Sequence, residues 1–297
     1  FRSWKTSTTS HNRGIYSLGP LRITTGDPLG IFRFERRYAG RDQVVVYPAV
    51  VPLPYFQLAA AGLPGEGPLR QRTHEVTPHA STVREYRPGD HVGRIHWPSS
   101  AKLGHLMVKE FDQGLTSDLW VLLDLNRESP VTLGNESAEE KAVTIAASIS
   151  ARFLKEHLPV GVAISGNMPE AIQPENGDLQ ATRTMDFLAR VTGKKNTSLS
   201  GALTALEPWM TRRTSLVVVS TSSDKAWISA LEKIVLQGIQ ANVVLVDNSS
   251  YGGESSPEPL LSSIVDLGIV SYLVKQGDDI NHVLSTPRVP HRTRPVL

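Results

Sequence analysis

Apolar and polar positions divide the chain into two parts that meet near residue 116. In the second part, continuous apolar runs of five to seven residues cover 118–124, 160–164, 215–220, 241–247 and 270–274. Such runs are typical of strands that are buried on both faces of a sheet. Between them, apolar residues recur every three or four positions, which predicts helices over 136–157, 179–191, 199–210 and 226–237.

Strands that alternate with helices favour right-handed crossovers and a mostly parallel sheet with both faces covered. Ser198 stands where a helix N-cap is expected, and Gly238 fits a left-handed C-cap. We therefore predict a doubly wound α/β domain over residues 117–285. The basic, Pro-rich stretch 286–297 is expected to be a tail.

The first part of the chain has a different pattern. Short β-prone segments cover 15–18, 21–24, 31–38, 43–47, 84–86 and 106–111, and turn residues such as Gly19–Pro20 separate them. The stretch 59–68 is rich in Ala, Gly and Pro and is expected to be a loop. Turn signals at intervals of roughly ten residues favour a small β-sandwich-like region, so residues 1–116 are predicted to be an all-β domain.

Composition narrows the possible chemistry. The chain has no cysteine, which excludes disulfides and thiolate metal sites. Residues 1–116 carry 15 Lys and Arg against 9 Asp and Glu, whereas residues 117–297 carry 16 against 20. This asymmetry indicates either an anionic surface near the first part or merely unequal solvated faces. The Arg-rich stretch 33–41 is interpreted as a solvated edge strand whose charges prevent pairing with other chains, and no nucleic acid is expected as a partner.

No complete catalytic motif is present, and His91, His96 and His105 match no compact metal motif. In parallel sheets, sites form beyond the carboxyl ends of the strands. Loops 124–129, 195–198 and 221–224 lie at such ends and are rich in acids and hydroxyls, which are ligands that Mg²⁺ prefers. The alternative is that Asp124 only caps the turn that follows it.

The stretch 83–114 resembles the hallmark segment of the bacterial Domain of Unknown Function 58 family. The resemblance rests on Arg84, Tyr86, Gly89, Asp90, Ile95, Trp97, Ser100, Ala101, Leu106, Val108 and Glu110 in this order and spacing. Three segments upstream also resemble elements of this family, namely residues 13–20, 27–32 and 46–48. These signature residues are expected either to dock a partner or to serve as core and interdomain anchors.

The α/β layout also resembles the von Willebrand factor type A domain, a Rossmann-like fold with a metal-ion-dependent adhesion site. On that pattern Asp124 and Thr197 match outright. Other oxygen donors stand at or near the remaining positions, namely Asn126, Glu128, Ser222 and Asp224. The resemblance implies a degenerate site for Mg²⁺ or Mn²⁺.

The family resemblance implies a function as well. Its members typically have N-terminal membrane helices, and are thought to act with a MoxR-type AAA+ ATPase in assembling or maturing other proteins. The chain begins with Phe, and we expect its natural start to lie upstream. We therefore expect a non-enzymatic, membrane-anchored adaptor of the bacterial inner membrane whose soluble domains face the cytoplasm. The alternatives are a metal-dependent hydrolase that uses Asp124, Glu128 and Asp224, and a structural envelope protein.

Overall fold

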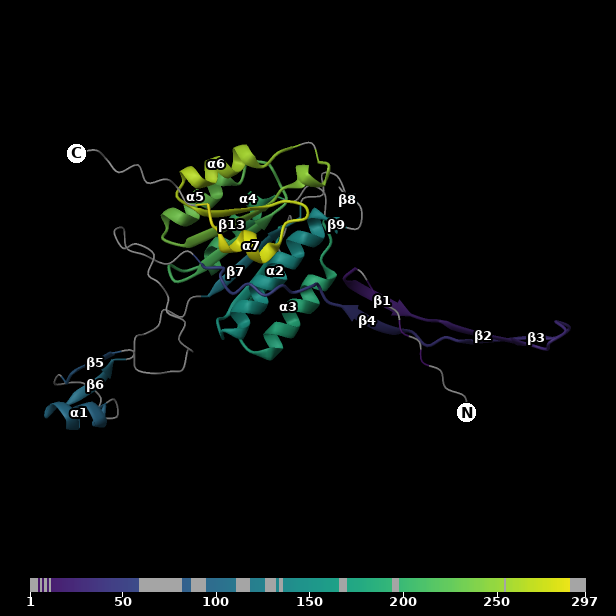
Figure 1. Cartoon of the computed structure of the whole chain (residues 1–297), viewed down its shortest axis with the longest axis horizontal. Coiled ribbons are helices and arrows are strands. Elements are labelled where there is room, and N and C mark those ends of the chain that lie inside the picture. The colour runs from purple at the N-terminus through teal and green to yellow at the C-terminus, as the bar shows by residue number, and fades with distance from the viewer. Residues whose placement is uncertain are drawn as a thin grey trace.

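The structure is a computed structural model. It describes residues 12–58, 82–86, 95–110, 118–125, 132–133, 136–165, 170–193, 198–253 and 255–288, together with Lys5, Ser7 and Ser10. A six-stranded sheet with helices on both faces forms the main body, and a long two-stranded ribbon extends from one end of it (Figure 1). The predicted mixed α/β class is confirmed.

The six-stranded sheet has the order β11-β10-β7-β12-β13-β14. Its strands are β7 (Leu119–Asp124), β10 (Val160–Ile164), β11 (Glu170–Glu175), β12 (Ser215–Ser220), β13 (Gln240–Val246) and β14 (Val270–Val274). The five predicted strands are all present and mutually parallel, whereas β11 pairs antiparallel with β10. The pattern did not predict β11 because this edge strand is polar and contains Pro174, which an edge tolerates.

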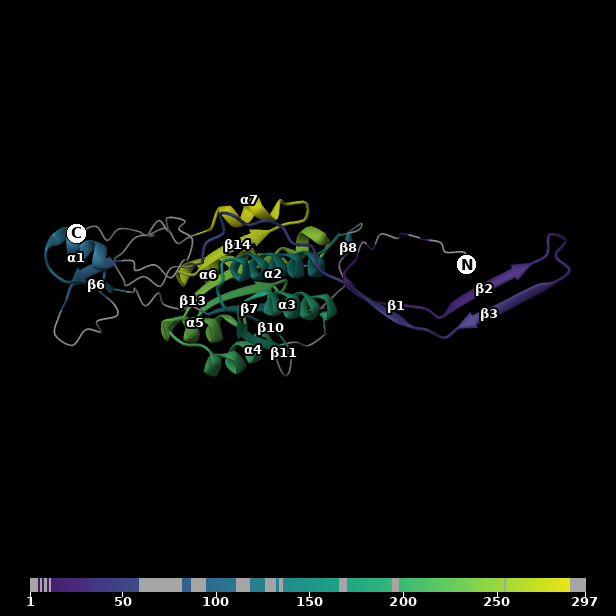
Figure 2. The same cartoon turned by 90° about the horizontal axis from the view of Figure 1, so that it is seen from below.

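Helices cover both faces of this sheet (Figure 2). One face carries α2 (Ala138–Lys155), α3 (Asp178–Arg190) and α7 (Ile280–Ser285); the other carries α4 (Leu199–Leu206), the 3-10 turn η2 (Glu207–Trp209), α5 (Ile228–Leu236) and α6 (Glu258–Asp266). Alternate residues of β7 enter the two cores, with Val121 on the α2 side and Leu122 on the α4 side. The short helices α6 and α7 were not predicted, and a further 3-10 turn, η3 (Asn248–Tyr251), follows β13.

An extended segment, residues 51–58, lies across the face that carries α2. Phe56 is 1% exposed, and its ring lies 5.5 Å from that of Tyr272 and 6.2 Å from that of Phe153. The guanidinium of Arg152 in α2 donates to the backbone carbonyls of Leu53 and Phe56. This segment therefore fastens the N-terminal part of the chain to the α/β body.

The ribbon consists of two antiparallel pairs that follow one another. Strands β1 (Gly14–Leu18) and β4 (Asp42–Val46) form the half next to α3, and β2 (Leu21–Gly26) and β3 (Arg33–Tyr38) form the outer half. The prediction of a β-sandwich-like region is wrong for the described residues. Each of these sheets has two strands, and a sandwich needs two larger sheets whose apolar faces cover one another.

A second small unit contains part of the signature stretch. Strands β5 (Thr82–Glu85) and β6 (Met107–Glu110) pair antiparallel, and α1 (Trp97–Leu103) packs against β6. Both views place this unit away from the α/β body (Figures 1 and 2). A two-residue hairpin pair, β8 (Thr132–Leu133) and β9 (Glu136–Ser137), precedes α2.

Candidate functional site

Asp124 ends the central strand β7, and its side chain is buried with 1% exposure. The hydroxyl of Ser165, directly after β10, donates to Oδ1, and the hydroxyl of Ser220, the last residue of β12, donates to Oδ2 at 2.7 Å. The parallel register places Ser220 directly beside Asp124. Three neighbouring strands thus end around one buried carboxylate.

A pocket of about 50 Å³ opens beside this carboxylate. It lies between the carboxyl ends of β7 and β12 and the N-terminus of α4. Its walls are formed by Asp124, Ser198, Leu199, Ser200, Ser222, Asp224, Ala226 and Trp227. Two aspartates and three serines therefore line a small volume at the edge of the sheet where ligands usually bind in open α/β folds.

The loop after β12 is shaped by a chain of short hydrogen bonds. The backbone N–H of Ser222 donates to the Ser220 hydroxyl at 3.0 Å, and the N–H of Asp224 donates to the Ser222 hydroxyl at 3.1 Å. Asp224 Oδ1 in turn accepts from the N–H of Ala226 at 3.0 Å. These local bonds within residues 220–226 fix Ser222 and Asp224 at the pocket.

Of the predicted metal ligands, the structure brings together Asp124, Ser222 and Asp224. The other three, Asn126, Glu128 and Thr197, lie outside the described residues. Ser198 belongs to the predicted loop 195–198 and also lines the pocket. Sequence reasoning did not propose Ser200 as a pocket residue, or Ser165 and Ser220 as the groups that hold Asp124. The sequence did contain a signal for Ser220, because this serine ends the buried apolar run 215–220. A hydroxyl at the carboxyl end of a parallel strand lies close to the ends of the adjacent strands, where sites form.

The pocket's donor set suits a hard cation that prefers oxygen ligands. Its volume exceeds the roughly 10–15 Å³ that one water needs, yet lies far below the roughly 300–1,000 Å³ of sites for small organic molecules. Within the described ranges, His, Cys, Asp and Glu side chains form no group of three that could hold a metal ion. Serine oxygens and bound waters would therefore have to complete a shell around Asp124 and Asp224.

The signature residues separate into a buried and an exposed set. Ile95 is 7% exposed and Ser100 is 8% exposed, and the Ser100 hydroxyl accepts from the Met107 N–H at 2.8 Å, which holds α1 on β6. By contrast, Trp97 is 63% exposed, and Ala101, one turn further along α1, is exposed as well. Trp97 is therefore not a core residue of this unit.

The remaining signature residues carry less information. Tyr86 is half-buried, and its N–H donates to the Leu106 carbonyl at 2.8 Å. Arg84 and Glu110 belong to the paired strands β5 and β6, and the structure describes their backbones only. Gly89 and Asp90 lie outside the described residues.

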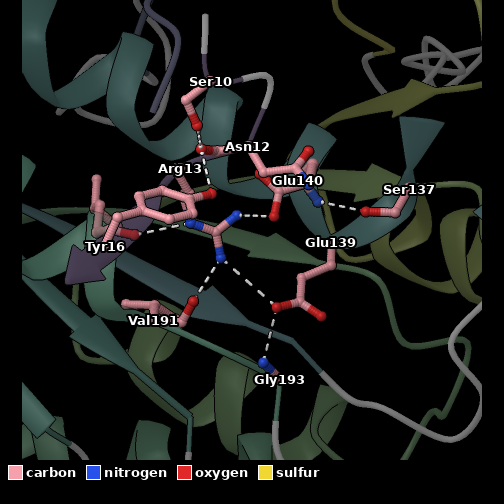
Figure 3. Close-up of polar contacts among 10 residues, drawn as sticks. Ser10, Asn12, Arg13, Tyr16, Ser137, Glu139, Glu140, Val191 and Gly193 are labelled. Carbon is pink, nitrogen blue, oxygen red and sulfur yellow. Dashed lines mark hydrogen bonds and ion pairs between the residues drawn. The ribbon is translucent and has the colours of Figure 1, made fainter. Parts of the chain in front are cut away.

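A buried arginine joins the ribbon to the α/β body (Figure 3). The side chain of Arg13 is 4% exposed, and its Nε and Nη2 donate to the carbonyls of Leu188 and Val191 at 3.0 and 2.5 Å, at the end of α3. The same guanidinium forms ion pairs with Glu139, at 3.6 Å, and Glu140 in the first turn of α2. We call this set of contacts the Arg13 junction.

The chain belongs to a family described as Protein of unknown function DUF58, whose sequence model matches residues 82–250 and so covers more than half of the chain. The Uncharacterized protein YeaD of Bacillus subtilis (strain 168) is 28% identical over 180 residues, which are 60% of this chain and 42% of that protein. The chain thus spans less than half the length of this relative. No helix in the described part of the chain is long and apolar enough to cross a membrane.

Two solved structures show a similar arrangement over 57% of the chain. The conserved hypothetical protein BatB from Bacteroides thetaiotaomicron is matched over 95% of its length, with a TM-score of 0.42 and 15% identity. An aerotolerance-related membrane protein from Bacteroides fragilis is matched over 94% of its length, with a TM-score of 0.43 and 16% identity.

Proposed function

We propose that this protein is a non-enzymatic adaptor that binds other proteins through a von Willebrand factor type A-like domain. The observation that carries the proposal is the small pocket beside Asp124, where carboxylates and hydroxyls from three segments face a volume of about 50 Å³. A pocket of this size accommodates an ion and a few oxygen atoms rather than a small organic substrate.

Asp124, Ser222 and Asp224 would hold a divalent cation such as Mg²⁺ or Mn²⁺, with Ser198 and Ser200 at the rim. The cation supplies a positive charge at the surface, to which a carboxylate of a partner protein binds. The buried indole N–H of Trp227, which also lines the pocket, has no hydrogen-bond partner among the described residues.

A second contact surface is proposed on α1. Trp97 and Ala101 lie one helical turn apart and are both exposed, so they share one face of the helix. Trp is enriched among the residues that dominate protein–protein binding energy. We propose this face as the docking site for a MoxR-type AAA+ ATPase, the partner that the family resemblance implies.

The same resemblance leads us to propose a membrane anchor that holds the protein at the bacterial inner membrane with these domains in the cytoplasm. The adaptor would then act in the assembly or maturation of other proteins. The alternative of a metal-dependent hydrolase would require turnover at the pocket, and a panel of phosphoester substrates tests it directly. Turnover that Asp124→Asn abolishes would replace the adaptor proposal.

The first experiment is calorimetric titration of the chain with Mg²⁺ and Mn²⁺, with Asp124→Asn as the test variant. Asp247→Asn is the matched control, because Asp247 is a buried carboxylate after β13, two strands away from β7, and its Oδ1 accepts from the N–H and the hydroxyl of Ser249 at the start of η3. We expect saturable binding that Asp124→Asn removes and Asp247→Asn preserves. Equal binding by wild type and Asp124→Asn would refute the site.

The docking face is tested separately, by measuring the affinity for a purified MoxR-type ATPase, the proposed partner. Trp97→Ala is expected to weaken binding at least about tenfold, as for a typical hot-spot residue. Trp209→Ala is the control, since Trp209 is 47% exposed but lies on the α/β body. Undiminished binding by Trp97→Ala would remove α1 from the interface.

A further inference from the structure

The outer end of the ribbon is a closed loop with an apolar surface. Residues Asp27–Phe32 connect β2 to β3, and three of the side chains there are largely exposed: Leu29 by 81%, Ile31 by 67% and Phe32 by 62%. Scattered single apolar residues are normal on a protein surface, but three within four positions at one tip are a patch. We call residues 28–32 the ribbon tip.

The loop that carries the tip is held in shape by Asp27. Its carboxylate accepts from the Phe32 N–H at 2.8 Å, and its own N–H donates to the Phe32 carbonyl at 3.2 Å. Gly30, with φ of 73°, adopts the left-handed conformation that the turn requires, and its N–H donates to the Asp27 carbonyl at 3.1 Å. The apolar side chains are thus presented by a formed loop, which lowers the entropy cost of binding.

Positive charge surrounds the stem behind the tip. Between Leu21 and Arg41 the chain has five arginines and two acidic residues. The strand register puts Arg33 opposite Gly26, next to the tip, and Arg36 and Arg37 three and four residues further along β3, on opposite faces of the ribbon. At roughly 3.3 Å per residue, these two lie about 10–13 Å behind Arg33.

We propose that the ribbon tip binds the surface of a lipid bilayer that contains anionic phospholipids. An element that lies in the interfacial region buries its apolar side chains roughly 5–10 Å deep while basic residues pair with headgroup phosphates. Insertion of Leu29, Ile31 and Phe32 to that depth would place Arg33 among the headgroups. Arg36 and Arg37 would then lie within reach of the negative surface potential.

The position of the tip fits this partner better than it fits a nucleic acid. Both views place the tip at the far end of the ribbon, so it meets a surface end-on and without hindrance from the described α/β body (Figures 1 and 2). Two of the arginines, Arg22 and Arg37, are paired with Glu35 at 3.2 and 2.7 Å, and the tip itself is aliphatic apart from Phe32. A single-strand binder would use Phe34 and Tyr38, which are exposed on β3, as stacking platforms along the stem and would not need an aliphatic end, so the apolar tip favours the bilayer.

This inference does not depend on the adaptor role. It stands on the ribbon alone and holds whether or not the pocket beside Asp124 binds a cation. It assigns a contact with the bilayer to the described part of the chain, in addition to any membrane helix elsewhere in the protein.

Co-sedimentation of the chain with vesicles tests the proposal. We expect binding to vesicles of phosphatidylcholine mixed with phosphatidylglycerol, weaker binding to phosphatidylcholine alone, and a decline with added salt. The double variant Leu29→Ser/Ile31→Ser is expected to bind the mixed vesicles at least about tenfold more weakly, since partial burial of two such side chains contributes that factor. Leu236→Ser is the control, because Leu236 is 80% exposed at the end of α5 on the α/β body.

Two further variants separate insertion from charge attraction. Phe32→Trp adds a fluorophore at the tip to the five native tryptophans. The difference between its emission and that of the wild-type chain is expected to shift to shorter wavelength on addition of mixed vesicles. Arg33→Gln/Arg36→Gln is expected to weaken binding to the mixed vesicles only, with Arg213→Gln, exposed on the α/β body, as its control. Exposed positions such as these do not impair folding, which a thermal melt of each variant verifies.

Several results would overturn the proposal. One is a wild-type chain that sediments with neither type of vesicle. Another is a Leu29→Ser/Ile31→Ser variant that binds as tightly as wild type, which would assign the binding to charge alone. A third result combines two observations. Labelled single-stranded DNA would bind the ribbon arginines and displace the chain from vesicles, and the emission of the Phe32→Trp variant would not shift when vesicles are added.

Discussion

The Ser220 hydroxyl donates to Asp124 Oδ2 at 2.7 Å and accepts from the Ser222 N–H at 3.0 Å. One hydroxyl thereby joins the buried carboxylate at the end of β7 to the loop that carries the other pocket residues. Because Ser220 is fully buried, water cannot easily replace either bond. The shape of the pocket therefore depends on this serine, although it does not line the pocket itself.

Replacing Ser220 with alanine is expected to lower the free energy of unfolding by about 2 kcal/mol, because it leaves a buried carboxylate oxygen and a backbone N–H without this partner. Urea denaturation measures the change. Ser271→Ala on β14 is the matched control, since Ser271 is also fully buried but its hydroxyl has no hydrogen-bond partner among the described residues. That substitution is expected to be neutral or stabilising. Equal losses in the two variants would show that the Ser220 bonds contribute nothing specific.

Tyr272 makes the fold sensitive to alkaline pH. Burial raises the pKa of this phenol to about 12, against opposing effects of the hydrogen bond with Asn242 and the charge of Arg152. The unfolded chain has a tyrosine pKa of about 10, so the folded state holds this proton more tightly. The resulting stability is fully present below pH 10 and is lost as the pH rises from 10 to about 12, by on the order of 2 kcal/mol.

The variant Tyr272→Phe is expected to remove this part of the pH dependence, because the phenylalanine ring has no proton to lose. Unfolding in urea at pH 9 and pH 11 measures the difference for wild type and variant. The ring still packs against Phe56, so the core contact remains. If the variant lost as much stability between the two pH values as wild type, another group would be responsible.

The parallel sheet could be predicted because its five parallel strands are continuous apolar runs, namely β7, β10, β12, β13 and β14. Edges and short helices could not be predicted this way. Strand β11 mixes polar and apolar residues at the edge of the sheet, and helix α1 is too short to show a helical repeat, with Ser100 as its buried residue. The sandwich was predicted from the regular spacing of turn signals. That spacing is the same whether short strands form two facing sheets or a two-stranded ribbon, and the ribbon leaves apolar side chains uncovered, as Phe34 at 67% exposure shows.

The candidate site was only partly predictable for a different reason. A sequence motif identifies residues such as Asp124 that line the pocket. It does not identify residues such as Ser165, which bind the Asp124 carboxylate from a neighbouring strand. Ser165 and Asp124 are 41 positions apart, and only the parallel pairing of β7 with β10 brings them together. Arg13 is a stronger example, since its partners on α3 lie 175 and 178 positions away.

Two phenylalanines provide a matched test of how the N-terminal segment is anchored. Phe56 is 1% exposed on the α/β body, whereas Phe32 is 62% exposed at the ribbon tip. Phe56→Ala is expected to cost about 3–5 kcal/mol because it leaves a cavity between Phe153 and Tyr272. Phe32→Ala is expected to change stability by less than about 0.5 kcal/mol. Thermal melts compare the two, and a large loss in Phe32→Ala would mean that the tip is covered in solution.

The Arg13 junction makes the strongest prediction about the link between ribbon and body. Arg13→Ala would leave Glu139 and the carbonyls at the end of α3 without their cation. The free energy of unfolding is expected to fall by about 2–3 kcal/mol, because the two glutamates remain partly exposed.

Glu139 also accepts from the Gly193 N–H at 2.9 Å, just before the segment that leads to Ser198. Hydrogen exchange is therefore expected to increase at Gly193 as well as in β1 and β4. Arg183→Ala, which breaks an exposed ion pair with Glu175, is the control and is expected to change neither. Unchanged protection of β1 in Arg13→Ala would show that the ribbon is held by segment 51–58 alone.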